Sequence, residues 1–312
     1  MNICKLAFEV LRERKVCLDW CADQGLFNKE RNCDICGSSM TYDYDYGVLG
    51  RHRCQRVSKH RKLKKGVVEV ITSENTFFYN ARLPIEQIIL IIMCWADMFS
   101  YEQTMKHGTF LSDGRLSSET VSDWFSYFRE LTMSFLDNLY VNKGKIGGPG
   151  IIVEIDETKI GKRKYNRGRM VEGSWILGFI ESGRENQSFR LEICPDNKRD
   201  AATLIPLILK HVEKGSIIRT DCWKSYDRLS EYGYTHETVN HSENFVDPIT
   251  GSHTQTIESN WRPLKKRINR GGVHKDKLAE HLCEFLWRRE IKKANKYAFE
   301  EILKGIASIK EW

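Results

Sequence analysis

The 312-residue sequence lacks a long apolar run, and this absence excludes one class of protein. The longest run, Ile88 to Trp95, is too short to cross a bilayer, since about 20 apolar residues are needed. The opening residues also lack the positively charged start, apolar core and small-residue cleavage site of a secretory signal. We therefore expect an intracellular protein that is not secreted and has no membrane segment.

The composition indicates a folded protein with two or three domains. With 41% hydrophobic and 29% charged residues, the chain is too apolar to be disordered. Ten cysteines in an intracellular chain are expected to be thiols or metal ligands, because disulfides are rare there. The formal charge of +7 is modest, but the basic residues are clustered, which favours a nucleic acid partner. A small positive excess without a polyanionic partner is the plainer alternative.

Residues 31–80 resemble a small β-rich module with a candidate metal site. Cys33 and Cys36 form a CxxC pair, and Cys54 and His60 follow further along the chain. Thiolate and imidazole ligands suit tetrahedral Zn²⁺, which would replace the apolar core that so small a module lacks. His52 is a less favoured fourth ligand than His60, and unmetallated thiols in a loop are the alternative to a zinc ribbon.

Eight cations and no acid stand between residues 51 and 65. Such a stretch is expected to contact phosphates and to make binding strongly salt-dependent. A nuclear-import signal or a solvated face is the alternative, and import is compatible with DNA binding. The candidate DNA contacts in this stretch are Arg56, Lys59, Arg61 and Lys62.

Two amphipathic helices are predicted before residue 145. The first begins near Pro84 with apolar residues on one face, and the second, capped by Ser117 or Ser118, continues through Leu131. This pair is either a helix-turn-helix that reads DNA or a plain helical hairpin. The predicted domains are a helical segment (1–30), a zinc-ribbon-like module (31–80), a helical region (81–145) and a catalytic domain with C-terminal helices (146–312).

The last domain begins with three strands before its first helix. The glycine-rich segment from Lys143 to Gly150 is a linker, because it precedes a strand and no helix follows it directly. The order of elements after it predicts an α/β fold, a mixed sheet with flanking helices in the ribonuclease-H-like order. The predicted strands are 151–156, 174–181, 188–194, 216–220 and 235–239, and the predicted helices are 201–212, 225–232 and two that start near 254 and 275.

Three acidic residues in this domain are candidates for catalysis. Asp156 ends one apolar strand and Asp221 follows another, and a carboxylate there is costly unless it meets a metal, a partner or water. Glu258 lies on a helix that carries Arg262 and Lys265 one and two turns later. Three carboxylates supply the oxygen ligands that a pair of Mg²⁺ or Mn²⁺ ions prefers, and the two cations would bind a substrate phosphate. The alternative is that each acid only caps a turn, caps a helix or pairs at the surface.

Four stretches resemble the catalytic domain of Merlin-superfamily DDE transposases and their bacterial insertion-sequence relatives. They are VEIDETKIGKRKYNRGR, WILGFIE, RTDCWKSYDRL and HTQTIESNWRPLKKRI, and the match runs from about Ile151 to Ala294. The resemblance implies that Asp156, Asp221 and Glu258 bind the catalytic metal ions, and it selects Asp156 over the neighbouring acids. The interval of 36 residues between Asp221 and Glu258 fits the family, and Lys265 matches a lysine seen in related transposases.

The resemblance implies a DNA transposase that cleaves transposon ends and joins them to target DNA. The expected cofactors are two Mg²⁺ (or Mn²⁺) ions, and the expected partners are double-stranded DNA, in the form of terminal inverted repeats and target, and further copies of the chain. The expected location is the nucleus in a eukaryote, or the cytoplasm and nucleoid in a bacterium. A domesticated DNA-binding protein and a structure-specific nuclease are the alternatives. Further candidate DNA contacts on the loop after the first strand are Lys159, Lys162, Arg163 and Lys164, and His253 is a weaker candidate for orienting a phosphate or a water.

Overall fold

The structure is a computed structural model that divides into two compact units. The first unit comprises Met1–Leu131 and Ala294–Trp312, and the second comprises Thr132–Lys293. In the part of the chain that the structure describes, no helix is both long and apolar enough to cross a membrane. The described residues are 1–60, 66–109, 116–161, 173–183, 187–239, 253–268 and 273–309.

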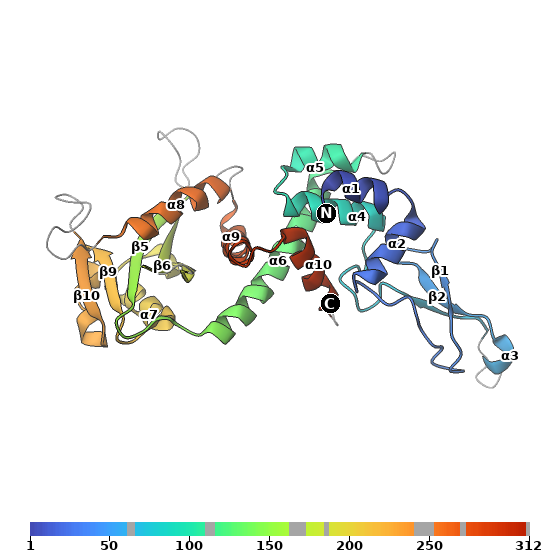
Figure 1. Cartoon of the computed structure of the whole chain (residues 1–312), viewed down its shortest axis with the longest axis horizontal. Coiled ribbons are helices and arrows are strands. Elements are labelled where there is room, and N and C mark those ends of the chain that lie inside the picture. The colour runs from blue at the N-terminus through green and yellow to red at the C-terminus, as the bar shows by residue number, and fades with distance from the viewer. Residues whose placement is uncertain are drawn as a thin grey trace. The chain divides into compact units, whose positions relative to one another are not determined.

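A buried helix, α4 (Ile85–Ala96), forms the centre of the first unit (Figure 1). Its sequence predicts one apolar face, but every residue of α4 except Glu86 is buried. The reason is that helices from both ends of the chain pack around it, which buries its remaining faces as well. A helix enclosed in this way has no side chains to place in a DNA groove. The helices around α4 are α1 (Ile3–Glu9), α2 (Arg14–Asp23), α5 (Tyr101–Gly108) and α10 (Ala298–Ala307).

Helix α5 is absent from the sequence-based prediction, which has only a turn around Gly108. It begins at a capping box, in which the Ser100 side chain accepts from the Gln103 N–H and the Gln103 side chain accepts from the Ser100 N–H. The next helix, α6 (Ser118–Lys143), agrees with the prediction. Its start is capped by Ser117, whose hydroxyl accepts from the Thr120 N–H at 3.1 Å. The two predicted helices are therefore separated by a third one.

A three-stranded antiparallel sheet confirms the β-rich module predicted for residues 31–80. Its middle strand pairs on both sides, and a short helix follows it. The elements are β1 (Thr41–Asp43), β2 (Arg51–Cys54), α3 (Val57–His60) and β3 (Val68–Ile71).

The second unit is built on a mixed five-stranded sheet with the order β10-β9-β5-β6-β7. Strands β5, β6 and β7 form an antiparallel meander, and β9 and β10 add in parallel on the other side of β5. This topology is ribonuclease-H-like, as the sequence predicts. A separate two-stranded sheet pairs β4 (Ile146–Gly147) with β8 (Val212–Glu213). The main strands are β5 (Ile152–Ile160), β6 (Ser174–Glu181), β7 (Phe189–Ile193), β9 (Ile217–Asp221) and β10 (Thr235–Val239).

Helices cover the two faces of this sheet differently. Helix α7 (Ala201–His211) buries Leu204 and Ile208 in an apolar core with Ile155 and Phe179 of the sheet. Helix α8 (Gln255–Ile268) crosses β5 and β6 on the other face (Figure 1). The C-terminal part continues with η6 (Lys275–Lys277) and α9 (Leu278–Lys293).

The helix predicted for residues 225–232 is wrong in type. The segment forms two 3₁₀ turns, η4 (Lys224–Tyr226) and η5 (Leu229–Tyr232). Tyr226 and Leu229 are both fully buried in the core under the sheet. Tyr226 ends the first turn and Leu229 begins the second, so each turn contributes one side chain to this core. A further 3₁₀ turn, η3 (Pro195–Asn197), follows β7.

The predicted four-domain division stays a prediction. Contacts group α10 with the first unit, whereas the sequence predicts that residues 294–312 extend the catalytic domain. The apolar residues of α10 account for this grouping, because Phe299, Ile302 and Leu303 are buried in the first unit.

Leu204→Ala should test the core between α7 and the sheet. The side chain is fully buried, so its loss should lower the free energy of unfolding by about 2–5 kcal/mol. Val141→Ala is the control, since Val141 of the same unit is 82% exposed and its truncation should change stability by less than about 0.5 kcal/mol. Urea denaturation measures both, and equal losses would contradict the described packing.

Candidate active site and metal centre

Asp156 and Asp221 lie level with each other on neighbouring parallel strands. The ladder between β5 and β9 pairs Ile152 with Ile217 and ends with Glu154 paired to Arg219. Two residues further along each strand stand Asp156 and Asp221. Adjacent strands are about 4.8 Å apart, and residues in register on parallel strands point to the same face. The two aspartates therefore share one face of the sheet.

The sequence predicts that Asp156 ends its strand, and this is wrong in one respect. Strand β5 continues to Ile160, because its pairing with β6 extends beyond the aspartate. Asp156 itself pairs with Gly178 of β6. Only the pairing with β9 stops before Asp156, so the aspartate lies where β5 and β9 part.

Strand alternation separates Asp156 from its acidic neighbour Glu157. Val153 and Ile155 point into the apolar core on the α7 side, and Glu157 follows them to that side. Burial raises the pKa of Glu157 to about 7, and the charges of Asp156 and Asp221 act in the same direction. Glu154 and Asp156 point the other way, toward α8. Asp156 and Glu157 therefore lie on opposite faces of the sheet, and the choice of Asp156 as a catalytic residue stays a prediction.

The carboxylate of Asp156 interacts electrostatically with both of the other candidate acids. Burial raises its pKa, and the negative charges of Asp221 and Glu258 raise it further, while a hydrogen bond from Trp261 opposes these effects. The Trp261 Nε1–H donates to Asp156 Oδ2 at 2.7 Å. Three elements that are distant in sequence, β5, β9 and α8, thereby bring their acids into one electrostatic group.

Each of the three carboxylates also accepts a hydrogen bond from the protein. Asp221 Oδ1 accepts from the Trp223 N–H at 3.0 Å, and Glu258 Oε1 accepts from the Thr254 hydroxyl at 3.0 Å. The three acids do not form a group as compact as that of Cys33, Cys36, Cys54 and His60 in the β-rich module. Like charges repel, so carboxylates on one face keep apart unless a cation compensates them.

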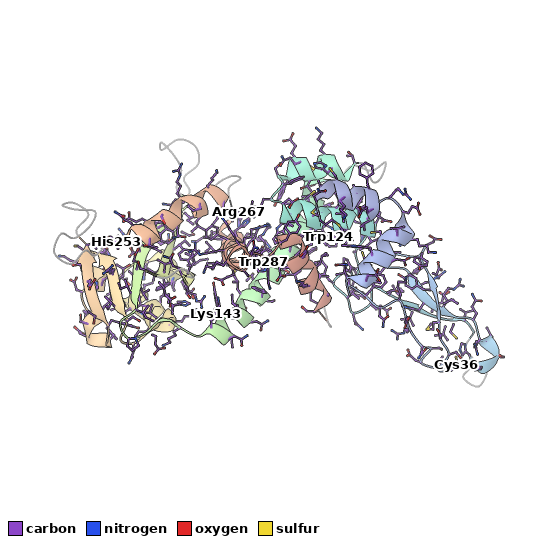
Figure 2. The ribbon with its side chains drawn as sticks, in the orientation of Figure 1. Cys36, Trp124, Lys143, His253, Arg267 and Trp287 are labelled. Atoms are coloured by element: carbon purple, nitrogen blue, oxygen red, sulfur yellow. The ribbon has the colours of Figure 1, made fainter. Side chains whose placement is uncertain are left out.

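Glu154 ties the start of α8 to β5. It is fully buried, and its Oε2 accepts from the Ile257 N–H at 2.9 Å. Ile257 is in the first turn of α8, where backbone N–H groups have no partner within the helix. His253, labelled in Figure 2 just before α8, has its Nδ1 3.6 Å from Glu154 Oε1. The sequence prediction missed this role of Glu154, because a buried strand acid gives no local sign of the helix it meets.

A cluster of cations and tryptophans lies on the α7 side of the sheet, the side of Glu157. The guanidinium of Arg199 stacks between Trp175 and Trp223, 4.3 Å from each ring centroid, and Lys159 Nζ is 5.4 Å from the Trp175 ring. On α8, Lys265 is half-buried and Arg262 is exposed. The sequence prediction missed Arg199, since its partners lie on other elements. The predicted DNA contacts Arg61, Lys62, Lys162, Arg163 and Lys164 lie outside the described residues.

A Cys₃His group forms in the β-rich module, with ligand atoms that all lie within 4.8 Å of one another. Its members are Cys33, Cys36, Cys54 and His60, the metal-ligand group found among the described residues. The separation is 3.6 Å from His60 Nε2 to Cys33 Sγ and 3.5 Å to Cys54 Sγ. Such a donor set could hold Zn²⁺.

The surroundings of this group suit a metal ligand set. His60 Nδ1 is 2.8 Å from the Gly66 carbonyl, a contact that turns Nε2 toward the thiols. The pKa of Cys36 falls to about 6, because the Ser38 hydroxyl and N–H donate to its sulfur. His52, the less favoured alternative, is engaged elsewhere, with Nε2 3.1 Å from the Lys29 carbonyl. The favoured prediction of His60 as the fourth member of the group agrees with this geometry.

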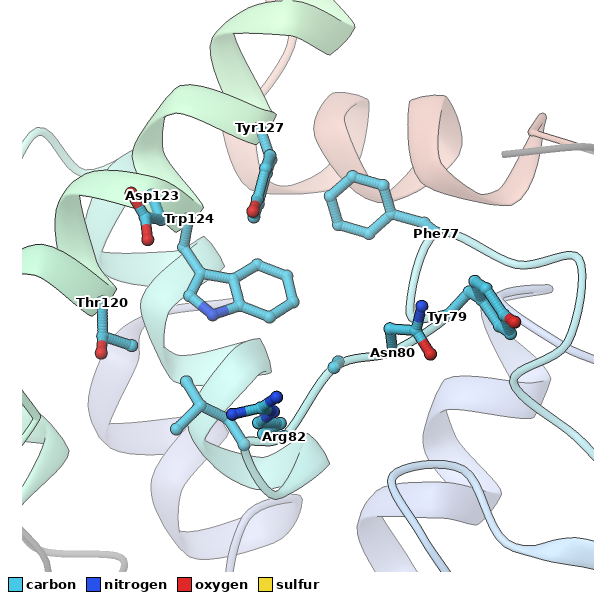
Figure 3. A pocket seen from close by; sticks show the side chains of 10 residues that line it. Phe77, Tyr79, Asn80, Arg82, Thr120, Asp123, Trp124 and Tyr127 are labelled. Carbon is cyan, nitrogen blue, oxygen red and sulfur yellow. The ribbon is translucent and has the colours of Figure 1, made fainter.

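A separate hollow of about 520 Å³ lies in the first unit, between residues 77–83 and α6 (Figure 3). Aromatic rings line it, and Trp124 makes edge contacts with Phe77 and Tyr127 at centroid distances of 5.9 and 5.8 Å. Its lining includes one carboxylate, Asp123. As far as the described residues show, this hollow lacks the several oxygen ligands that a catalytic metal site requires.

The described site can be compared with known proteins. A model of the ISXO2-like transposase domain matches residues 117–290, which is more than half of the chain. The chain belongs to this family. The match contains Asp156, Asp221 and Glu258, and it confirms the resemblance to DDE transposases, while membership of the Merlin superfamily stays a prediction.

Two relatives match shorter segments of this chain. An uncharacterized transposase-like protein of Haemophilus influenzae is 32% identical over 89 residues, which are 28% of this chain and 71% of that protein. Male abnormal protein mab-31 of Caenorhabditis elegans is 24% identical over 117 residues, or 38% of this chain. The match spans only about a quarter of mab-31, 27% of its length.

Solved structures with similarity to this chain include the core domain of an integrase and a strand transfer complex. The catalytic core domain of BIV integrase matches with a TM-score of 0.30 and 15% identity, covering 49% of this chain and 93% of that one. The Mos1 strand transfer complex matches with a TM-score of 0.26 and 14% identity, covering 73% and 97%. At these scores the likeness adds nothing to the strand order described above.

Metal content should test the Cys₃His group. The purified protein should contain about one zinc ion per chain, and Cys36→Ser and His60→Ala should lose most of it because each removes a ligand. Cys4→Ser, at an exposed thiol outside the group, and His52→Ala should keep it. Plasma mass spectrometry gives the zinc content, and full zinc in Cys36→Ser would exclude the site.

Proposed function

We propose that this chain is a DNA transposase whose active site consists of Asp156, Asp221 and Glu258. The observation that supports it best is the convergence of three acids from β5, β9 and α8 on one face of the sheet. The structural alternatives for the separate acids, a turn cap or a surface pair, do not explain why burial and two further negative charges act on Asp156 together. Membership of a transposase family supplies the reaction class.

The three acids suit a hard divalent cation. Their donors are all oxygens, and burial and the charges of Asp221 and Glu258 raise the pKa of Asp156, so a bound cation would offset the repulsion among the three acids. Asp156, Asp221 and Glu258 would hold Mg²⁺ or Mn²⁺. Such ions supply an activated water and stabilise the oxygen that leaves phosphorus.

The proposed reaction has two displacements at one site. A water oxygen attacks phosphorus at the transposon end, the bond to the 3′-oxygen breaks, and that oxygen leaves as a 3′-hydroxyl. This hydroxyl then attacks a phosphodiester of target DNA. A bond from the transposon 3′-oxygen to phosphorus forms, the bond from that phosphorus to the target's own 3′-oxygen breaks, and this oxygen takes up the proton and leaves as a 3′-hydroxyl. Lys265 and Arg262, on the helix of Glu258, would hold the negative phosphate beside the acids.

The proposed partners are double-stranded DNA and further copies of the chain. Terminal repeats would be bound by the β-rich module, whose Arg56 and Lys59 are candidate phosphate contacts, and by the helical region. Two transposon ends must be engaged together, which favours an oligomer. We propose a nuclear location in a eukaryotic host and a nucleoid location in a bacterial one.

Asp156→Asn should remove strand cleavage and leave DNA binding intact. The substitution keeps the size of the side chain but removes the charge, so nicking of a supercoiled plasmid in Mn²⁺ should fall below about 1% of the wild-type rate. Binding of a 30-base-pair duplex, measured by fluorescence anisotropy, should change less than about twofold. Asp23→Asn, at an exposed position in α2, is the matched control and should cleave normally.

Retained cleavage by Asp156→Asn would contradict the assignment of the active site. A second assay with a pre-cut 3′ end follows the joining step. Cleavage without joining would restrict the function to that of a nuclease.

Lys265→Ala should weaken DNA binding equally for different sequences. A lysine that contacts one phosphate contributes about one unit to the slope of log affinity against log salt, so this slope should decrease by about 1. Lys210→Ala is the control, because Lys210 already pairs with Glu192. The measurement is anisotropy of a random-sequence duplex over a series of salt concentrations, and an unchanged slope would exclude the phosphate contact.

A further inference from the structure

An indole N–H is aimed at one oxygen of the proposed metal ligand Asp156. Trp261 Nε1 is 2.7 Å from Asp156 Oδ2, and the Trp261 side chain is buried. The indole nitrogen can only donate, so the contact favours the ionised carboxylate. Charge-assisted hydrogen bonds of this length are among the stronger ones in proteins. The bond holds one oxygen of Asp156 and thereby fixes the plane of the carboxylate.

The sheet leaves room for this indole at Gly178. Gly178 is the cross-strand partner of Asp156 on β6. A Cβ at this position would lie 2.3 Å from Trp261 Cη2, which is closer than real contacts allow, and it would make tight contacts with Trp261 Cζ2 at 3.0 Å and Ile257 Cδ1 at 3.1 Å. The backbone of Gly178 is not in the left-handed region, so conformation does not require a glycine here. Space for the ring is what the glycine provides.

Helix α8 is fixed to β5 on both sides of Glu258. Before it, the Ile257 N–H donates to Glu154, and after it, Trp261 donates to Asp156. Glu258 and Trp261 are three residues apart and so share one helix face. Two contacts to the same strand set the height and rotation of this turn, and therefore the position of Glu258 relative to Asp156.

We propose that Trp261 is a positioning residue, which orients Asp156 and Glu258 for metal binding in the space left by Gly178. The proposal rests on the proposed function, because it assigns a role at the same carboxylates. Trp261 also packs near Phe189, with ring centroids 6.5 Å apart. A purely packing role would stabilise the fold without affecting metal affinity, so the two roles can be separated by measurement.

Trp261→Phe removes the N–H and keeps an aromatic ring. Loss of a group that orients a metal ligand costs about 10–100-fold in metal affinity. We expect the dissociation constant for Mn²⁺, measured by calorimetry without DNA, to rise by about that factor. Trp287→Phe is the matched control, since this buried tryptophan of α9 belongs to the same unit, and its dissociation constant should stay within about twofold of wild type.

A double-variant cycle tests the role of the glycine. In the otherwise wild-type protein, Gly178→Ala should displace the indole and weaken Mn²⁺ binding. In the Trp261→Phe background the same change should cost much less, because the phenyl ring lacks the Cη2 and Cζ2 atoms and only the contact of the methyl group with Ile257 Cδ1 at 3.1 Å remains. Additive losses would contradict the proposal. Gly178→Ala alone also tests it if Trp261→Phe does not fold.

Asp156→Asn separates the two proposals. If Asp156→Asn binds Mn²⁺ like the wild type, the proposed active site fails. If Asp156→Asn loses Mn²⁺ while Trp261→Phe behaves like Trp287→Phe, the active site stands and the positioning role of Trp261 is overturned.

Discussion

Repulsion between carboxylates on one face of a sheet is the constraint on which the second unit depends. Burial and the charges of Asp221 and Glu258 raise the pKa of Asp156, so the fold holds an arrangement that is unfavourable in electrostatic terms. Hydrogen bonds from Trp261, Trp223 and Thr254 offset part of this cost, one for each acid. Burying unfavourable charge in a defined place is typical of a site that meets a cation or a substrate.

The sheet positions the two aspartates, and α8 positions Glu258. The parallel register of β5 and β9 brings two aspartates level, and the apolar core on the α7 side keeps that register fixed. On the other face, Glu154 and Trp261 attach α8 to β5 around Glu258. The Cys₃His module in the other unit uses different chemistry, in which three thiols and an imidazole form a group that could hold zinc. The chain thus contains a group of oxygen donors in one unit and a group of sulfur and nitrogen donors in the other.

Local patterns in the sequence predict much of this fold and less of its contacts. Apolar alternation and motif resemblance give the five strands, and the same motifs identify Asp156, Asp221 and Glu258. Helix α5 escapes prediction, because the glycine at its end resembles a turn. The roles of Glu154, Gly178 and Trp261 also escape, since each depends on a partner that is far away in sequence. Spacing along the chain cannot show that the ring of Trp261 lies against Gly178.

Crystals soaked in Mn²⁺ provide the most direct test of the central claim. Anomalous scattering locates Mn²⁺ independently of any assumption about the ligands. The account predicts a peak bound by carboxylate oxygens of Asp156, Asp221 and Glu258, with the Trp261 N–H still on Asp156. A metal bound elsewhere, or an occupied site from which any of the three acids is turned away, would contradict it.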